Sequence, residues 1–234
     1  MSVTKQTIAL MLLAVIGAVF LTLLSGYVAD EELNLTARYY AENTTSDIGA
    51  TNIVTAIIVT YRGLDTLGEV TVLFLAAAIV GLILAHSKRA DNIPRERVPA
   101  GEILTTGSRT LVPLILLLGI YVFVNGHLTP GGGFQGGAIL ASASLLMLLA
   151  DPAKQFSHRL IAIIESFSGF TYVLLGTLGL FLAGGFMDNR ILPVGVTGEL
   201  FSAGAIPLIY SLIGLKVGAE FSSILSNLTE SEDL

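Results

Sequence analysis

Long apolar segments alternate with short polar ones along the whole chain. Six such segments stand out: Thr7–Val28, Leu67–His86, Thr110–Gly126, Gly136–Ala150, Leu160–Gly185 and Ala205–Ser226. A helix needs about 20 predominantly apolar residues to cross the hydrocarbon core of a bilayer, and most of these segments reach or approach that length. The pattern predicts an all-α fold, a polytopic bundle of transmembrane helices with about six spans.

A shorter apolar stretch between the first two spans needs a separate interpretation. The sequence IVTAIIVTY at residues 53–61 is too short to cross a bilayer as a helix. We expect residues 48–62 to form an interfacial or partly inserted helix. The alternative is a seventh crossing, which would move the N-terminus to the other side of the membrane.

The composition favours a membrane protein over a soluble one. Hydrophobic residues make up 53% of the chain and charged residues only 13%, and the mean hydropathy is +0.79. Ordinary globular domains carry about 25% charged residues. Because the chain has no cysteine and its histidines (His86, His127 and His158) are far apart, we predict no metal site, no cofactor and no catalytic residue. The net charge of −6 argues against a nucleic-acid partner.

Lysine and arginine are distributed unequally between the two sides of the predicted bundle. If the N-terminus lies inside, the inner segments hold eight of them: Lys5, Lys88, Arg89, Arg95, Arg97, Arg109, Lys154 and Arg159. The outer segments hold only Arg38, Arg62 and Arg190. Because cytoplasmic loops are enriched in these residues, we predict a multi-pass protein of the cell membrane with both termini in the cytoplasm.

The run NGHLTPGGGFQGGAI at residues 125–139 contains a match to the dinucleotide pattern G-x-G-x-x-G. That fingerprint follows a β-strand, whereas a lipid-length apolar segment precedes it here, so we reject nucleotide binding. The run contributes a glycine loop: Pro130, Gly131, Gly132, Gly133, Gln135, Gly136 and Gly137.

Two interpretations of the glycine loop stay open. The fourth apolar segment has 15 residues and would reach only about 22 Å as a helix. The loop could therefore dip inward and complete the crossing, with Gly136 and Gly137 opening the helix. Alternatively, it is a tight outer turn whose small residues let neighbouring helices pack closely.

The same run, together with GLKVG at residues 214–218, resembles the B-type subunit (MnhB) of the Mrp/Mnh-type multisubunit Na⁺/H⁺ antiporters, over about residues 103–226. Upstream, residues 52–77 are similar to the C-terminal domain of the large A-type subunit of these antiporters. They are also similar to the small E-type subunit of archaeal membrane-bound hydrogenase and sulfur-reducing complexes. The resemblance implies a non-catalytic subunit that assembles in the lipid bilayer with other membrane subunits, including large antiporter-like ones, and serves Na⁺ and H⁺ transport. It is closer to the respiratory complexes than to a simple antiporter.

A charged connector, SKRADNIPRERVPAGE at residues 87–102, separates the two resemblances. We therefore divide the chain into three parts. Residues 1–86 form an E-type membrane segment, like the C-terminal part of the A-type subunit. Residues 87–102 form a cytoplasmic connector, and residues 103–234 form an MnhB-like membrane domain with four helices.

Three ionisable residues fall within the last two spans. Lys216 and Glu220 are four residues apart and so share one helix face, while Glu165 lies at a similar depth in the preceding span. An ionisable residue at the bilayer centre costs about 2.5–3.5 kcal/mol on insertion scales. Either the three form a polar relay for protons or Na⁺, or Lys216 and Glu220 are a neutralised pair that joins subunits while Glu165 satisfies a neighbour's polar group.

Two further positions are hypotheses for the ion path. Arg62, Asp65 and Glu69 share one helix face within the most distinctive part of the resemblance to the A-type subunit, which implies that Glu69, with Asp65, lies on a cation path. A solvated cluster at the outer surface is the alternative. His127 lies at an outer helix end, where it either titrates near neutral pH or binds the glycine loop through its ring.

Three functions are compatible with these observations. The first is an ion-path subunit of an Mrp-type cation/proton antiporter module, within a hydrogenase-like or sulfur-reducing respiratory complex. The second is a structural connector without an ion path of its own. The third, a standalone solute carrier, is the weakest because the sequence shows no internal repeat of the kind on which many carriers are built.

Overall fold

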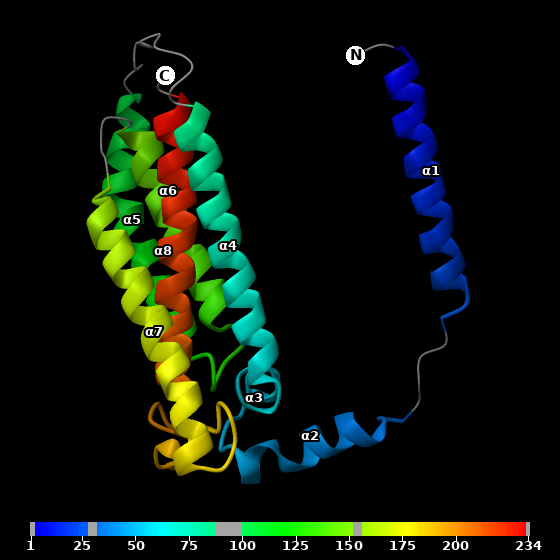
Figure 1. Ribbon diagram of the computed structural model, residues 1–234, viewed down its shortest axis with the longest axis vertical. Coiled ribbons are helices and arrows are strands. Elements are labelled where there is room, and N and C mark those ends of the chain that lie inside the picture. Colours follow the sequence, from blue (N-terminus) through cyan, green and yellow to red (C-terminus); the bar gives the residue numbers. More distant parts are fainter. Residues whose placement is uncertain (1–2, 28–31, 88–99, 152–155, 233–234) are drawn as a thin grey trace. The chain divides into compact units, whose positions relative to one another are not determined.

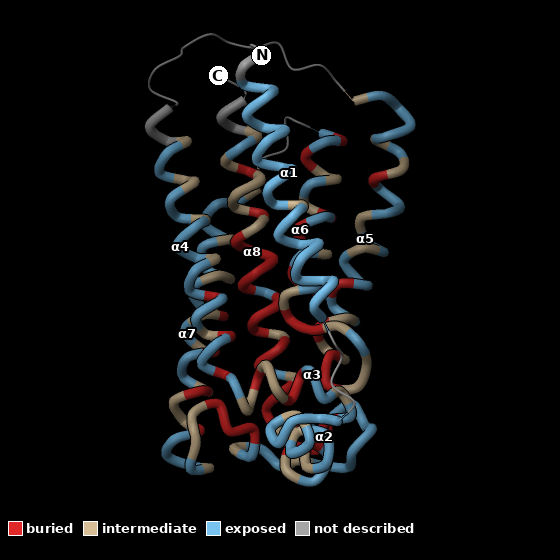
Figure 2. Tube along the Cα trace, turned by 90° about the vertical axis from the view of Figure 1, so that its right-hand side faces the viewer, coloured by how far each residue is buried: buried red, intermediate tan, exposed pale blue. Residues whose placement is uncertain are grey.

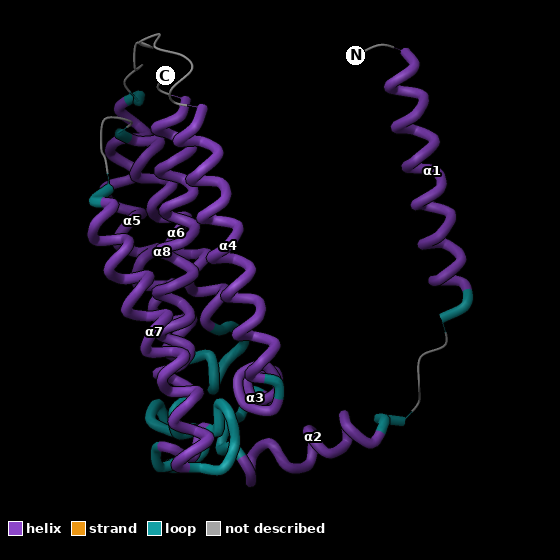
Figure 3. Tube along the Cα trace, in the orientation of Figure 1, coloured by secondary structure: helices purple, strands orange, loops and turns teal. Residues whose placement is uncertain are grey.

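The computed structural model of the protein describes residues 3–27, 32–87, 100–151 and 156–232. All regular elements of this part are helical (Figure 3). They are α1 (Val3–Ser25), α2 (Leu35–Asp47), α3 (Ile53–Ala56), the π-helix η1 (Ile57–Tyr61), α4 (Gly63–Ser87), α5 (Glu102–Val124), α6 (Gly133–Ala150), α7 (His158–Leu182), the 3-10 helix η2 (Asn189–Ile191) and α8 (Ile206–Glu232). Most of the predicted connector, residues 88–99, lies outside the described residues.

Six of these helices are long and apolar enough to cross a membrane: α1, α4, α5, α6, α7 and α8. This confirms the predicted all-α bundle with six spans. Residues 53–61, the apolar stretch that was too short to span, form α3 and η1 and are not among the candidate spans. The helix α2 was not predicted, because its polar sequence LTARYYAENTTSD has no apolar stripe to mark it.

The chain forms two compact units, residues 1–38 and 39–234. The first unit contains α1, whose long apolar side chains are exposed around the whole helix, from Ile8 to Leu24. A helix that is apolar all round is typical of a membrane span rather than of a surface helix.

In the second unit α8 is the central helix, and α4, α5, α6 and α7 all contact it (Figure 1). Figure 2 shows that α8 is buried along much of its length, while the outward surfaces of α4 and α7 are exposed. Buried apolar residues recur on α8 at helical spacing, namely Ile206, Ile209, Ile213 and Val217. The helix with the most buried surface is therefore also the one that carries Lys216 and Glu220.

Close approach between α6 and its neighbours depends on glycine. A Cβ at Gly137 would lie 2.7 Å from Cβ of Val217, and one at Gly136 would lie 2.7 Å from the carbonyl oxygen of Gly119. Neither distance is compatible with a side chain. These contacts support the interpretation of the run as a close helix-packing surface.

The expected start of the fourth span was wrong. The helix α6 begins at Gly133 and has 18 residues, so it reaches about 27 Å. Gly136 and Gly137 lie inside this helix instead of opening it. With 18 residues the fourth span falls within the range of about 17–25 residues for a membrane helix, and the reason for invoking a loop that dips into the membrane disappears.

At one end of the bundle, three segments distant in sequence form what we call the loop cap, defined as residues 47–56, 125–132 and 187–206. The side-chain amide of Asn52 donates to the carbonyl oxygens of Gly126 and Thr129, both at 2.9 Å. The amide of Asn189 donates to those of Ile48 and Ala203, at 2.9 and 3.0 Å. These neutral side chains satisfy backbone carbonyls that no regular helix satisfies.

Asn52 also explains why a helix begins at residue 53. Its side-chain oxygen accepts hydrogen bonds from the backbone N–H groups of Val54 and Thr55, which is the usual way in which asparagine caps a helix. In the same short helix, the Thr55 hydroxyl donates to the carbonyl of Gly126 and accepts from the hydroxyl of Tyr210 on α8. The short helix is thus attached to the bundle by polar contacts.

Candidate functional site

The charge cluster, defined as Glu165, Lys216 and Glu220, lies between α7 and α8. The Lys216 ammonium is 2.8 Å from Oε1 of Glu220, one helical turn along α8, and 4.0 Å from Oε1 of Glu165 on α7. Their side chains are 11%, 0% and 20% exposed for Lys216, Glu220 and Glu165 respectively. The structure therefore brings the three predicted residues together, with the lysine between the two carboxylates.

The geometry follows from where the sequence puts these residues. The four-residue spacing aims Lys216 and Glu220 in the same direction from α8. The lysine stem packs against Gly169, one turn after Glu165 on α7, because a Cβ there would lie 3.4 Å from the Lys216 side chain, at van der Waals contact. The ammonium also lies 4.9 Å from the ring centroid of Phe74 on α4, within the range of a cation–π contact.

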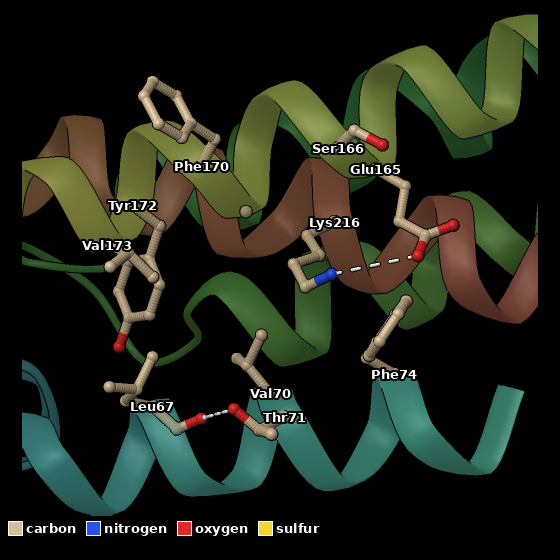
Figure 4. Close-up of a pocket in the computed structure, with 11 residues that line it drawn as sticks. Leu67, Val70, Thr71, Phe74, Glu165, Ser166, Phe170, Tyr172, Val173 and Lys216 are labelled. Atoms are coloured by element: carbon tan, nitrogen blue, oxygen red, sulfur yellow. Dashed lines mark hydrogen bonds and ion pairs between the residues drawn. The ribbon is translucent and has the colours of Figure 1, made fainter. Parts of the chain in front are cut away.

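A cavity of about 300 Å³ opens beside the ammonium, between α4, α7 and α8 (Figure 4). Figure 4 shows Lys216 reaching toward Glu165, with Phe74 of α4 beside it. Apolar side chains line most of the cavity, and Thr71 and Tyr172 add hydroxyl groups toward the loop cap. The ion cluster therefore has space next to it and is not sealed by packing.

The carboxylate of Glu220 is not fully satisfied. Neither of its buried oxygens makes a hydrogen bond within the described residues, although Oε1 lies 2.8 Å from the Lys216 ammonium. Oε2 of Glu220 is buried and has no hydrogen-bond donor among the described residues. Buried polar atoms are almost always paired in native structures, and an exception calls for an explanation such as a catalytic role or a bound water or ion. With all three side chains ionised, the cluster carries two negative charges and one positive charge.

The second predicted group, Arg62, Asp65 and Glu69, lines a separate pocket of about 160 Å³ next to η1. Arg62 forms an ion pair with Asp65, and all three residues are exposed. Asp65 and Glu69 lie on α4, four residues apart, and Arg62, which directly precedes that helix, lines the same pocket. Leu67 and Val70 of α4 line the cavity beside Lys216, so the two spaces are neighbours along α4.

His127 lies inside the loop cap, fully buried. Its ring does not bind the glycine loop: Nε2 is 3.4 Å from the carbonyl oxygen of Glu199, and Nδ1 has no partner among the described residues. Its own carbonyl accepts from the backbone N–H groups of Thr51 and Asn52. Burial lowers the pKa of His127 below its usual value of 6.5, which favours the neutral ring.

Ionised groups also lie at the edge of the loop cap. Asp47 accepts hydrogen bonds from the hydroxyls of Tyr39 and Tyr61, at 3.0 and 3.2 Å. Burial and then the charge of Asp47 raise the pKa of Tyr61 to about 12. Asp188 forms an ion pair with Arg190, and the hydrogen bond from that guanidinium lowers the pKa of Asp188.

Sequence reasoning missed several contributors to these sites. Phe74 is one of many aromatic residues in apolar segments, and nothing in the sequence singles it out. Asn52 and Asn189 are ordinary loop residues whose partners are distant in sequence, up to 141 positions away for Asn189 and Ile48. Within the described residues, no group of three or more His, Cys, Asp or Glu is arranged to hold a metal ion.

Comparison with known proteins shows the family to which the chain belongs. The family described as a domain related to the MnhB subunit of the Na⁺/H⁺ antiporter matches residues 103–223, about half of the chain. The chain belongs to this family. A second family, described as the E subunit of MBH (MbhE), matches residues 5–96 of this MnhB-related chain. The two matches confirm both of the resemblances that the sequence motifs indicated.

Individual relatives extend the comparison over nearly the whole MnhB-related chain. An uncharacterised protein of Methanocaldococcus jannaschii is 33% identical over 195 residues, 74% of each chain. In the structure of the membrane-bound sulfane sulfur reductase (MBS), an archaeal respiratory membrane complex, one chain is 41% identical with a TM-score of 0.81, covering 96% of this chain and 98% of that one.

A second solved structure, the Mrp complex from Dietzia, contains a longer chain of the same fold. It is 27% identical with a TM-score of 0.75, and the match covers 97% of this chain but only 26% of that one. Both structural relatives are subunits of multisubunit membrane complexes. The protein is therefore a multi-pass, Mrp/Mnh antiporter-related membrane subunit, with other membrane subunits as partners.

Proposed function

We propose that the chain is an ion-path subunit of an Mrp-type cation/proton antiporter module, in a respiratory complex of the sulfur-reducing kind with large antiporter-like subunits. The near full-length similarity to a chain of the sulfane sulfur reductase supports the kind of complex. The family match supports the kind of module. Na⁺ and H⁺ are the proposed ions, and lipid is the proposed surrounding.

One observation carries the assignment of an ion path to this chain. A lysine lies between two carboxylates in the interior of the bundle, 2.8 and 4.0 Å from them, beside a cavity of about 300 Å³. Ionisable residues inside a membrane protein are costly and usually mark substrate or ion pathways. The cavity gives this cluster the access that a path requires.

The residues on either side of the charge cluster suggest the order in which an ion would pass them. From the loop-cap end, Asp65 and Glu69 would collect cations at the surface, and the cavity with Thr71 and Tyr172 would connect them to Lys216. Beyond Glu220, the polar residues Ser223 and Asn227 continue the same face of α8, three and seven positions on. His127, buried and favoured as the neutral ring, is left out of this path.

The structural-connector alternative is not favoured. In that alternative Glu165 was expected to satisfy a polar group of a neighbour, but its Oε1 lies 4.0 Å from the Lys216 ammonium of its own chain. The cluster therefore needs no partner subunit to pair its positive charge.

From the bias of lysine and arginine we propose that the loop cap lies on the outer side of the cell membrane and that both termini lie in the cytoplasm. We also propose the division of the chain into an E-type membrane segment (residues 1–86), a connector (residues 87–102) and an MnhB-like domain (residues 103–234). Because the natural chain has no cysteine, a cysteine introduced at Glu199 should react with a membrane-impermeant reagent added outside intact cells. If the cysteine reacted only after the membrane had been permeabilised, the loop cap would lie on the cytoplasmic side, opposite to the proposed orientation.

Charge-neutralising substitutions test the path in the intact complex. Glu165→Gln leaves Lys216 and Glu220 as a neutral pair, so the fold should be spared, and Glu69→Gln removes only an exposed charge. Each is expected to slow Na⁺/H⁺ exchange by about tenfold or more, because removing a positioned proton-transfer group commonly costs about 10²-fold or more. Exchange is measured in inverted membrane vesicles with a fluorescent probe of the pH gradient.

Glu199→Gln is the matched control, since it removes an exposed acidic residue of the loop cap that lines neither of the two spaces on the path. Assembly of each variant is followed by native gel electrophoresis. Normal Na⁺/H⁺ exchange by fully assembled Glu165→Gln and Glu69→Gln complexes would contradict the proposal and favour the alternative of a structural connector without an ion path.

A further inference from the structure

The charge balance of the cluster calls for one additional positive charge. Ionised Glu165 and Glu220 together with Lys216 leave a net charge of −1 in the interior of the bundle. A buried charge without compensation is costly, and proteins avoid it by pairing or by neutralisation. Either a bound metal cation such as Na⁺ or a proton on a carboxylate would restore neutrality.

The surroundings do not suit a metal cation. Hard cations are held by several oxygen ligands, and Na⁺ sites in transporters commonly use backbone carbonyls freed where a helix is broken. At the cluster, α7 and α8 are continuous helices whose carbonyls are engaged in their own hydrogen bonds. The Lys216 ammonium, 2.8 Å from Oε1 of Glu220, would also repel a cation bound to that carboxylate.

A proton needs only a single oxygen, and one is available. Oε2 of Glu220 is buried and has no donor among the described residues. Outside the cluster itself, α7 places the phenol of Tyr172 in the cavity wall. Glu69 on α4 comes in sequence directly before the lining residue Val70 but lines the separate pocket next to η1. The neighbouring helices add few ionisable side chains. In α4 there is no acidic, basic or histidine residue between Val70 and Leu84, and α6 has none. In α5 such residues are Glu102 and Arg109, both near the start of the helix.

We infer that the charge cluster binds one exchangeable proton, shared between Glu220 and Glu165, and excludes Na⁺. This inference rests on the proposed function and narrows the substrate of this part of the path to H⁺. Any Na⁺ step would then take place elsewhere, on another part of this chain or on a partner subunit.

Infrared difference spectroscopy of the purified, reconstituted complex tests the inference directly. We expect a carbonyl band of a protonated carboxylic acid that shifts in ²H₂O. It should be absent in Glu220→Gln and present in the control Ser222→Ala, whose hydroxyl faces Ser144 on α6. At constant pH, replacing choline by Na⁺ in the buffer should leave the band unchanged.

Glu165→Gln provides a second variant in which Glu220 is untouched. Removing one negative charge leaves Lys216 and Glu220 balanced, so the carboxylic acid band should disappear here as well. Survival of the band in both assembled variants, or in Glu165→Gln alone if Glu220→Gln does not assemble, would overturn the inference. Loss of the wild-type band on adding Na⁺ at constant pH would do the same, because Na⁺ would then compete for the carboxylate.

A transport measurement on the same samples separates this inference from the proposed function. Glu220→Gln is expected to slow Na⁺-driven proton movement by about tenfold or more. If the spectra are as expected but exchange continues at the wild-type rate, the proton site stands and the proposed ion path through it fails. If exchange is lost but Na⁺ removes the wild-type band, the path stands and the assignment to H⁺ is wrong.

Discussion

The loop cap and the charge cluster are both buried and polar, but they differ in what satisfies their polar atoms. In the loop cap, neutral side chains such as Asn52, Thr55 and Asn189 donate to backbone carbonyls of distant segments. In the charge cluster, Lys216 and two carboxylates contact one another, and one carboxylate oxygen has no donor among the described residues.

This difference separates a structural role from a functional one. Neutral hydrogen bonds between distant segments rigidify the part of the protein that contains them, because a rearrangement leaves buried groups unpaired. An ionised cluster with an uncompensated negative charge can bind or release a proton without rearranging the backbone. Changes in the loop cap should therefore reduce stability and assembly, whereas neutralising changes in the cluster should reduce transport in a complex that still assembles.

The largest effect is expected for Gly204→Ala in the loop cap. Gly204 has a φ of +59°, and a Cβ there would collide with the carbonyl oxygen of Asn189. Overpacking costs about 1–3 kcal/mol and a non-glycine residue in this backbone region costs about 1–3 kcal/mol more. Thermal unfolding of the purified complex and protease cleavage within residues 187–206 should both show the loss.

Gly198→Ala is the matched control because it separates the two causes. Gly198 has a φ of +97° but nothing lies within 4 Å of a Cβ there, so this variant bears the backbone strain without the collision. A Gly204→Ala complex as stable as the Gly198→Ala complex would remove the argument that close packing holds the loop cap together.

A smaller effect, limited to acid pH, is expected from His127. Because burial lowers the pKa of the folded-state ring below 6.5, the stabilisation that comes from burying the neutral ring is fully present above pH 6.5. It decreases as the pH falls from 6.5 towards the lowered value, since the unfolded chain then binds a proton that the folded chain does not. The acid form should loosen the contact between residues 51–52 and 127.

Hydrogen exchange at the amides of Thr51 and Asn52, which donate to the His127 carbonyl, measures this loosening. After correction for chemical exchange, protection should begin to fall as the pH decreases below about 6.5, the usual value for histidine, and should continue to fall towards the lowered pKa of His127. His127→Phe should abolish the change, and His158→Phe, at the exposed start of α7, should preserve it. An unchanged acid response in His127→Phe would show that another group controls the loop cap.

Predictions that depend on local composition were accurate. The six spans follow from runs of apolar residues, and a span requires nothing beyond its own length and hydrophobicity. The pairing of Lys216 with Glu220 follows from the helix repeat alone. The shared face of Asp65 and Glu69 on α4 follows in the same way, whereas Arg62 lies just before that helix and reaches Asp65 from outside it.

Predictions that depend on contacts between distant segments were incomplete or wrong. The start of α6 was placed at Gly136, because a run of glycines carries little hydropathy, whereas packing against α5 and α8 extends the helix back to Gly133. The partner of the His127 ring was expected in the glycine loop, 3 to 10 residues away. It is Glu199, 72 positions away, and no local pattern encodes such a distance.

The amino-acid sequence by itself determined that this is a membrane protein, and it determined the six candidate spans, the antiporter-related family and the helix faces that carry charge. Each of these is a property of a single segment or of a recognisable motif. Only the tertiary structure decided that Lys216 meets Glu165, that Glu220 keeps one oxygen without a donor, and that a cavity lies beside them. The rotation of α7 and α4 around α8 sets these contacts, and it depends on how all the side chains of the bundle pack together at once.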